Sequence, residues 1–261
     1  MDKALESYVL HLADNAVVLA QRNAEWCGHG PVLEEDLAMA NQSLDLIGQA
    51  RLLYAYVAET RGGDCTEDRL AYFRDEHEYS NFTLLELPHR VNLLSTHSAT
   101  RDYAVTIVRN FLYGVYAVLM WDGLTRSTDA RLAEIAAKAL KESHYHLRHA
   151  SDWLERLGDG TDESHQRMQA ALDYLMPYTQ EFWAVHPGFA ALVSRGVATD
   201  MRAQHATWDA AVSQALVRAT LARSSEAGHV PTGSRGVHSE HMGFLLAEMQ
   251  SLARAHPEAV W

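Results

Sequence analysis

Residues 33–60 read LEEDLAMANQSLDLIGQARLLYAYVAET, and this run predicts one long α-helix. Its apolar residues recur at steps of three and four, which is the spacing of one helix face. No proline interrupts the run, and Arg61-Gly62-Gly63 ends it. We expect the inner side of this helix to consist of Leu37, Ala40, Leu44, Ile47, Gly48, Arg51 and Leu52.

The rest of the chain predicts further helices joined by short loops. They cover residues 3–25, 67–87, 99–124, 130–157, 162–185, 200–222 and 238–255, with a short segment at 189–195 and a loop at 224–236. The chain has only three isoleucines, whereas the core of a β-sheet is rich in β-branched residues. The sequence therefore predicts a single all-α domain over residues 1–261, an antiparallel bundle of long helices.

Composition excludes several classes of protein. The chain has 261 residues, and 48% of them are apolar, which suits a large core and excludes disorder. The formal net charge is −12, and the sequence has no stripe of basic residues that could contact the phosphates of a nucleic acid. Cys27 and Cys65 cannot form a disulfide framework. The N-terminus lacks a signal-peptide pattern, and no run of apolar residues is long enough to span a membrane. We expect a cytoplasmic protein.

Two Glu-x-x-Tyr pairs look like altered metal ligands. Bundles of long helices bind two iron ions through carboxylates and Glu-x-x-His pairs, because residues i and i+3 share a helix face. Here the pairs are Glu76–Tyr79 and Glu142–Tyr145, with tyrosine in place of histidine. A phenol, whose pKa is about 10, is rarely ionised and is therefore a poor ligand.

Three further positions belong to the same incomplete pattern. Asp45 precedes Glu76 by a distance that suits neighbouring antiparallel helices, while the matching position before Glu142 holds Tyr113. His146 lies one turn after Glu142 and could share an ion with it. We interpret these residues as remnants of a lost metal site and expect neither a bound metal nor a catalytic residue. The alternative is an autonomous di-iron oxidase or oxygenase that uses Glu76, Glu142 and His146.

The last predicted helix begins with a histidine pair. His238 and His241 are three residues apart, but a zinc site would need a third ligand that the sequence does not place. A polar helix start with Glu240 near the positive end of the helix dipole explains the pattern. A subunit interface is the other explanation.

Longer motifs resemble the C-subunit family of the phenylacetyl-CoA epoxygenases. The resemblance covers nearly the whole chain and is weakest over residues 184–198 and 224–236. The matching motifs are Ala13–Asn15, Gln21-Arg22, Glu25–His29, Asp36–Ala38, Ala40-Asn41, Leu44–Arg51, Arg74–Glu76, Ser80-Asn81, Lys141-Glu142, Tyr145–Arg148, Trp153–Gly158, His238–Gly243 and Leu246–Gln250.

The resemblance implies a ferritin-like bundle with extra C-terminal helices. It implies a non-catalytic structural subunit that pairs with a homologous catalytic subunit, stabilises it and has no cofactor of its own. That catalytic subunit holds the di-iron site and epoxidises the aromatic ring of phenylacetyl-CoA. The other implied components are further small subunits and a reductase that uses FAD, an iron–sulfur cluster and NADPH.

The resemblance also implies a contact with the substrate. The segment Glu78-Tyr79-Ser80-Asn81 matches a family segment that contacts an acyl-CoA ligand, and a Ser-Asn pair offers donors and acceptors to such a ligand. A metal-free acyl-CoA-binding module is therefore a further alternative. His238, Glu240 and His241 belong to the tail motif of the family.

Overall fold

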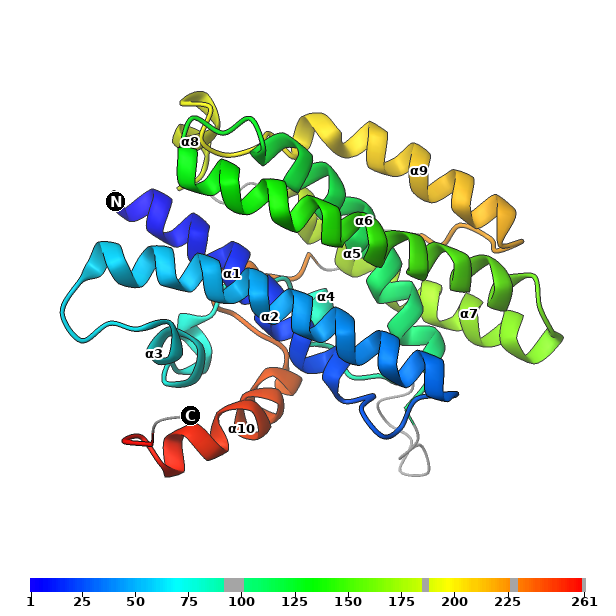
Figure 1. Ribbon diagram of the computed structural model, residues 1–261. Coiled ribbons are helices and arrows are strands. Elements are labelled where there is room, and N and C mark those ends of the chain that lie inside the picture. The colour runs from blue at the N-terminus through cyan, green and yellow to red at the C-terminus, as the bar shows by residue number, and fades with distance from the viewer. Residues whose placement is uncertain (92–100, 185–187, 226–229, 260–261) are drawn as a thin grey trace. The chain divides into compact units, whose positions relative to one another are not determined.

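The computed structural model describes residues 1–91, 101–184, 188–225 and 230–259 (Figure 1). The packing of the chain divides it into two compact units: residues 1–87 with 231–261, and residues 88–230. Within the described residues both units are helical, and the strand-like pairing is limited to one isolated bridge between Thr232 and Val237. The all-α prediction is confirmed, whereas the single domain over residues 1–261 stays a prediction.

Unit 1 is built on an antiparallel pair of long helices, α1 (Lys3–Ala24) and α2 (Leu33–Arg61). Arg61 at the end of α2 forms an ion pair of 2.7 Å with Glu6 near the start of α1, as expected for an antiparallel pair. Asp2 caps α1 by accepting a hydrogen bond from the Leu5 amide. The unit also contains α3 (Glu67–Tyr72), a 3₁₀ turn η1 (Glu76–Glu78), α4 (Thr83–Glu86), a second 3₁₀ turn η4 (Gly233–Arg235) and α10 (Glu240–Ala255).

The inner side predicted for α2 is wrong. Leu37 and Leu44 leave 56% and 65% of their surface exposed, and Arg51 is exposed as well. The helix is apolar on two opposite sides, so periodicity alone cannot tell which side is buried. Of the other predicted inner residues, Ile47 and Leu52 are exposed, and Ala40 and Gly48 are half-buried. The buried side consists of Met39, Gln42, Ser43, Leu46, Gln49, Ala50, Leu53, Tyr54, Val57 and Ala58, with Glu35.

The single helix predicted over residues 67–87 is also wrong. The structure has α3, η1 and α4, separated by extended backbone at Asp75, Tyr79 and Phe82. A continuous helix would have presented Glu76 and Tyr79 on one face, but the 3₁₀ turn ends between them. The interruption brings Arg74 and Tyr79 into the interior of unit 1, where both are buried.

Unit 2 contains the second antiparallel pair of long helices, α5 (Tyr103–Leu124) and α6 (Ala130–Gly158). The ring of Tyr103 near the start of α5 packs edge-on against Trp153 near the end of α6, with 6.0 Å between centroids. Trp208 on α9 (His205–Arg218) is fully buried and donates a hydrogen bond of 3.1 Å to the carbonyl of Leu112. The remaining elements are α7 (Asp162–Leu175), a 3₁₀ segment (Met176–Trp183), α8 (Ala190–Ser194) and η3 (Arg202–Gln204).

Most predicted helix boundaries in unit 2 lie close to the observed ones. The helix predicted over 99–124 begins at Tyr103, and residues 92–100 lie outside the described part of the chain. The helix predicted over 162–185 ends as an α-helix at Leu175, because Pro177 starts a 3₁₀ segment. The helix predicted over 200–222 is divided between η3 and α9. Of the loop predicted at 224–236, residues 226–229 lie outside the described residues.

One helix has the length and composition of a membrane span. An 18-residue window of α5 passes this test, but 89% of that window is buried inside the protein. The interior of a helical protein produces the same apolar composition. This helix is therefore weak evidence for a membrane span.

Gly158 tests the packing of unit 2, and Gly48 in unit 1 is its control. A Cβ at Gly158 would lie 2.4 Å from the carbonyl oxygen of Ala219, whereas a Cβ at Gly48 on α2 meets nothing within 4 Å. We expect Gly158→Ala to lower the free energy of unfolding by about 1–3 kcal/mol through the clash. We expect Gly48→Ala to raise it by about 0.5–1 kcal/mol through helix propensity. Urea titrations compare the two, and equal stability changes would contradict the packing described for Gly158.

Candidate functional site

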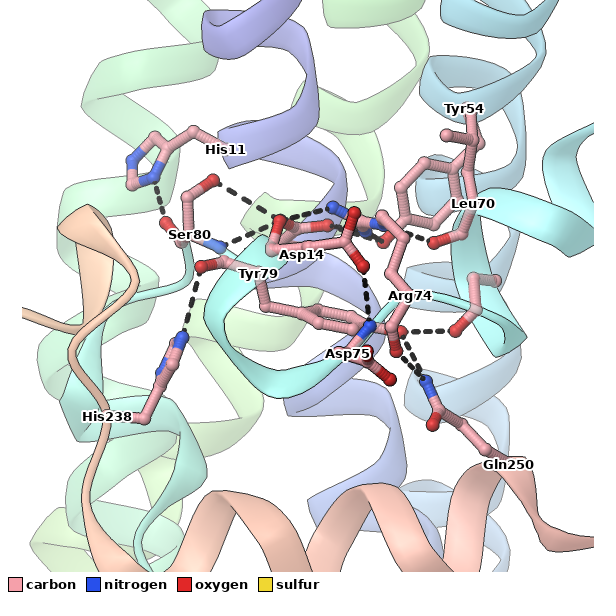
Figure 2. A network of polar contacts seen from close by, with 12 residues as sticks. His11, Asp14, Tyr54, Leu70, Arg74, Asp75, Tyr79, Ser80, His238 and Gln250 are labelled. Carbon is pink, nitrogen blue, oxygen red and sulfur yellow. Dashed lines mark hydrogen bonds and ion pairs between the residues drawn. The ribbon is translucent and has the colours of Figure 1, made fainter. Parts of the chain in front are cut away.

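A buried carboxylate on α1, Asp14, lies at the centre of a polar network in unit 1 (Figure 2). It accepts hydrogen bonds from the Tyr54 hydroxyl at 2.6 Å, from the Ser80 amide at 2.9 Å and from the Ser80 hydroxyl at 3.2 Å. Arg74 donates to both of its oxygens and forms an ion pair with it. A buried charge is stable only when it is paired and hydrogen-bonded in this way.

Arg74 connects the segments before and after the 3₁₀ turn η1 by hydrogen bonds. Its Nε donates to the Leu70 carbonyl at 2.5 Å and its Nη1 to the Glu78 carbonyl at 2.9 Å. Its guanidinium lies 4.2 Å from the centre of the Tyr79 ring, within reach of a cation–π interaction. Burial lowers the pKa of Arg74, whereas the nearby negative charge of Asp14 raises it. The net pKa lies above the ordinary value, so the side chain stays charged.

The hydroxyl of Tyr79 makes two hydrogen bonds. The hydroxyl donates to the carbonyl of Ala71 and accepts a hydrogen bond of 3.0 Å from Nε2 of Gln250 on α10. Only 1% of Tyr79 is exposed, and burial raises the pKa of its phenol above the ordinary value of 10.0. The phenol therefore remains protonated and serves as a structural hydrogen-bonding group.

A second buried carboxylate, Glu86, holds the segment that precedes α10. It accepts from the Asn81 side-chain amide at 2.9 Å and from the Ser239 backbone amide at 2.5 Å. Nδ1 of His238 lies 2.7 Å from Glu86, and Nε2 lies 3.0 Å from the carbonyl oxygen of Tyr79. Since both ring nitrogens face acceptors, these contacts favour the imidazolium form of His238, in which both nitrogens donate.

The charge of His238 makes this contact dependent on pH. Burial lowers the pKa of His238. The hydrogen bond and charge of Glu86, the Tyr79 carbonyl and the charge of Glu76 raise it, and together they outweigh burial. The net pKa lies above the ordinary value of 6.5. The stabilisation is therefore complete below about pH 6.5 and is lost as the pH rises through the raised pKa.

The positions predicted for a lost metal site are divided between the two units, with Asp45, Glu76 and Tyr79 in unit 1 and the others in unit 2. Across the residues that the structure describes, no three His, Cys, Asp or Glu side chains are grouped so that they could hold a metal ion. Tyr145 is 52% exposed, and burial raises the pKa of Tyr113 and so disfavours the phenolate that would bind iron. Asp45, Glu142 and His146 are half-buried, and Glu76 is exposed. That these positions are remnants of a lost site stays a prediction.

The predicted acyl-CoA segment is largely part of the network. Tyr79 and Asn81 are buried and Ser80 is half-buried, whereas Glu78 is exposed and caps η1 by accepting from the Asp75 amide. Contact of this segment with phenylacetyl-CoA stays a prediction. In the tail motif, Glu240 is exposed and His241 is half-buried.

A shallow groove of about 270 Å³ lies between η1 and α10. Asp75 and Glu76 line one side, and Leu246 and Ala247 contribute apolar surface from α10. Pockets for drug-sized ligands are typically about 300–1,000 Å³. Arg254 also lines the groove, so its lining contains charges of both signs.

Sequence reasoning missed the centre of the network. Asp14, Arg74 and Glu86 were not predicted as site residues, although the first two lie in motifs that resemble the family. An aspartate in a run of apolar residues, as in Leu12-Ala13-Asp14, signals a buried and paired charge. The sequence does not reveal which cation pairs with it.

The two tyrosines of the Glu-x-x-Tyr pairs should differ in their effect on stability. We expect Tyr79→Phe to lower the free energy of unfolding by about 1–2 kcal/mol, because the buried partners of the hydroxyl lose a hydrogen bond. We expect Tyr145→Phe, at an exposed position, to change it by less than about 0.5 kcal/mol. Urea unfolding of both variants measures this, and equal effects would contradict the structural role of Tyr79.

The His238 contact predicts a pH profile. We expect the stability of the wild-type chain to fall more than that of His238→Gln as the pH rises from about 6 to about 9, because the raised pKa of His238 is lost as a source of stability over this range. The exposed His144 provides the control variant His144→Gln, which should follow the wild type. Unfolding curves at several pH values measure the slopes. A His238→Gln slope equal to that of the wild type would refute the charged contact.

The comparisons with known proteins agree with the family that the sequence motifs resemble. A family model described as phenylacetic acid catabolic protein matches residues 1–261. The chain is 44% identical over 258 residues to the C-subunit of the 1,2-phenylacetyl-CoA epoxidase of Escherichia coli (strain K12), covering 98% of this chain and 99% of that protein. The match therefore extends over both units. On these findings the chain belongs to the phenylacetic acid catabolic protein family.

Proposed function

We propose that this chain is a non-catalytic subunit of a multicomponent, cytoplasmic monooxygenase. It pairs with a homologous di-iron subunit and stabilises it, and that subunit epoxidises the aromatic ring of phenylacetyl-CoA. The other components of the proposal are small accessory subunits and a reductase with FAD and an iron–sulfur cluster that takes electrons from NADPH. The relative from Escherichia coli is one subunit of an epoxidase, which supports membership of such a complex.

The surroundings of the two Glu-x-x-Tyr pairs are the main support for this proposal. A di-iron centre needs ionised donors that converge from several helices. Tyr79 is protonated and hydrogen-bonded on both sides of its hydroxyl, and Glu76 is exposed on a 3₁₀ turn. In unit 2, Tyr145 is exposed. These side chains support the interpretation of a chain that retains helical packing without metal chemistry.

A subunit role also finds support on the surface of α2. Leu33, Leu37 and Leu44 of this helix are exposed and lie on one helix face, and exposed apolar residues grouped in this way are typical of protein interaction sites. The alternatives are an autonomous di-iron oxidase or oxygenase and a metal-free acyl-CoA-binding module. The first requires bound iron in the lone chain, and the second requires tight binding of a CoA ester.

Iron content and co-purification test the proposal together. We expect the chain expressed alone with added iron to contain far less than one iron per molecule, because the donor set is incomplete. Co-expressed with the catalytic subunit, it should purify as a complex and raise the melting temperature of that subunit. Ring epoxidation should require the catalytic subunit.

Two results would contradict the proposed function. Stoichiometric iron in the lone chain that Glu142→Gln removes would establish the oxidase alternative. Failure of the folded wild-type chain to co-purify with the catalytic subunit would refute the pairing. Isothermal titration with phenylacetyl-CoA separates the third alternative, which predicts micromolar affinity for the lone chain.

A further inference from the structure

The groove between η1 and α10 is lined by carboxylates on one side and by apolar side chains on the other. Asp75 and Glu76 lie on the η1 side, and Leu246 and Ala247 provide apolar surface from α10. Its volume of about 270 Å³ lies below the range for drug-sized ligands, which begins at about 300 Å³. The groove therefore suits a single side chain with an apolar stem and a polar end.

The carboxylate of Glu76 makes no ion pair or hydrogen bond with any residue that the structure describes. It lies against α10 at Gly243, where an added Cβ would come within 3.2 Å of its Oε2. Its charge helps to raise the pKa of His238, but both nitrogens of that ring face Glu86 and the Tyr79 carbonyl. Glu76 is therefore an acceptor whose donor does not come from the described part of the chain.

Gln250 presents a second acceptor to the groove. It lines the groove, although only 5% of its surface is exposed. Its Nε2 donates to the Arg74 carbonyl and to the Tyr79 hydroxyl, each at 3.0 Å, and the carbonyl, which can only accept, fixes the orientation of the amide. The amide oxygen points away from Tyr79 (Figure 2), and no described residue donates to it. A donor that enters the groove would satisfy this largely buried oxygen.

The donors that line the groove are already largely engaged. Nε and Nη2 of Arg254 donate to two backbone carbonyls, and Nη2 also to Asp75 at 3.3 Å. The Ser251 hydroxyl donates to the carbonyl of Glu248 at 3.2 Å. Asp75 and Glu76 against Arg254 leave the lining with an excess of negative charge. The open positions are acceptors, so the groove selects a cation with several donors.

An arginine side chain matches these positions. Its guanidinium carries five N–H donors in one plane and is weakly hydrated, so it can donate to both Glu76 and Gln250. Its methylene stem can lie along Leu246 and Ala247, as arginine stems do on apolar surfaces. A metal ion is a poorer occupant, because no three His, Cys, Asp or Glu side chains among the described residues are grouped to hold one.

We propose that the groove between η1 and α10 binds an arginine side chain of another protein. Two open acceptors, the excess negative charge and the apolar wall together define the chemistry of that side chain. An arginine that fills such a groove is typical of the residues that anchor protein interfaces. The proposal does not depend on the proposed function or on the exposed leucines of α2.

Titration of the full chain with a capped arginine, N-acetyl-L-arginine methylamide, tests the site. We expect saturable shifts of the amide NMR signals of η1 and α10, with a dissociation constant on the order of a millimolar at low salt. The citrulline analogue has a similar shape but no charge, and it should bind at least about 10-fold more weakly.

Variants of the groove test which residues hold the guanidinium. Glu76→Gln should weaken the binding of capped arginine at least about 5-fold, because it removes the charge that faces the guanidinium. Ala247→Phe should weaken it by filling the groove. The control is Glu240→Gln, since the Glu240 side chain is 79% exposed at the start of α10 and does not line the groove. It should bind as the wild type does, and far-UV circular dichroism checks that each variant is folded.

Four results would overturn the proposal. The first is a wild-type chain that shows no saturable binding of capped arginine up to about 50 mM. The second is equal binding of the citrulline analogue. The third is a folded Glu76→Gln variant that binds as tightly as the wild type. The fourth is binding of free L-arginine more than about 10-fold tighter than that of the capped form, which would assign the groove to a free amino acid.

Discussion

The burial of one negative charge, that of Asp14, constrains most of unit 1. Its donors come from α2, through Tyr54, and from the segment after α3, through Arg74 and Ser80. Removing Arg74 would leave the charge of Asp14 uncompensated in the interior, where such a loss costs about 3–5 kcal/mol. The rotation of α2 and the irregular path of residues 73–82 are therefore consequences of satisfying this carboxylate.

The same constraint explains where the sequence was informative. Helical periodicity predicted α1, α2, α5 and α6 with ends close to those observed, because their boundaries depend on local glycine, proline and capping residues. It failed for residues 67–87, where contacts with Asp14 override helix propensity, and for the rotation of α2, which is apolar on two sides. Both failures concern partners distant in the sequence, which no local pattern encodes.

The candidate site was likewise predicted only in part from the sequence. The sequence singled out Tyr79, Ser80, Asn81 and His238, and the structure places all four in one connected set of hydrogen bonds with Asp14 and Glu86. The sequence suggests ligand binding for Tyr79, Ser80 and Asn81 and a polar helix start or a subunit interface for His238, and these roles stay predictions. The contacts that the structure shows hold the polypeptide together. A Glu-x-x-Tyr spacing indicates a shared helix face only where the backbone is helical, and at Glu76–Tyr79 it is not. Residues that resemble ligands can therefore be kept for folding.

A double-mutant cycle tests most directly whether Asp14 and Arg74 stabilise unit 1 as a pair. Free energies of unfolding are measured for the wild type, Asp14→Asn, Arg74→Gln and the double variant. We expect each single change to cost about 3–5 kcal/mol and the two to be coupled by about 2 kcal/mol or more, because each leaves its partner charged and buried. Additive effects, with coupling below about 0.5 kcal/mol, would contradict this account.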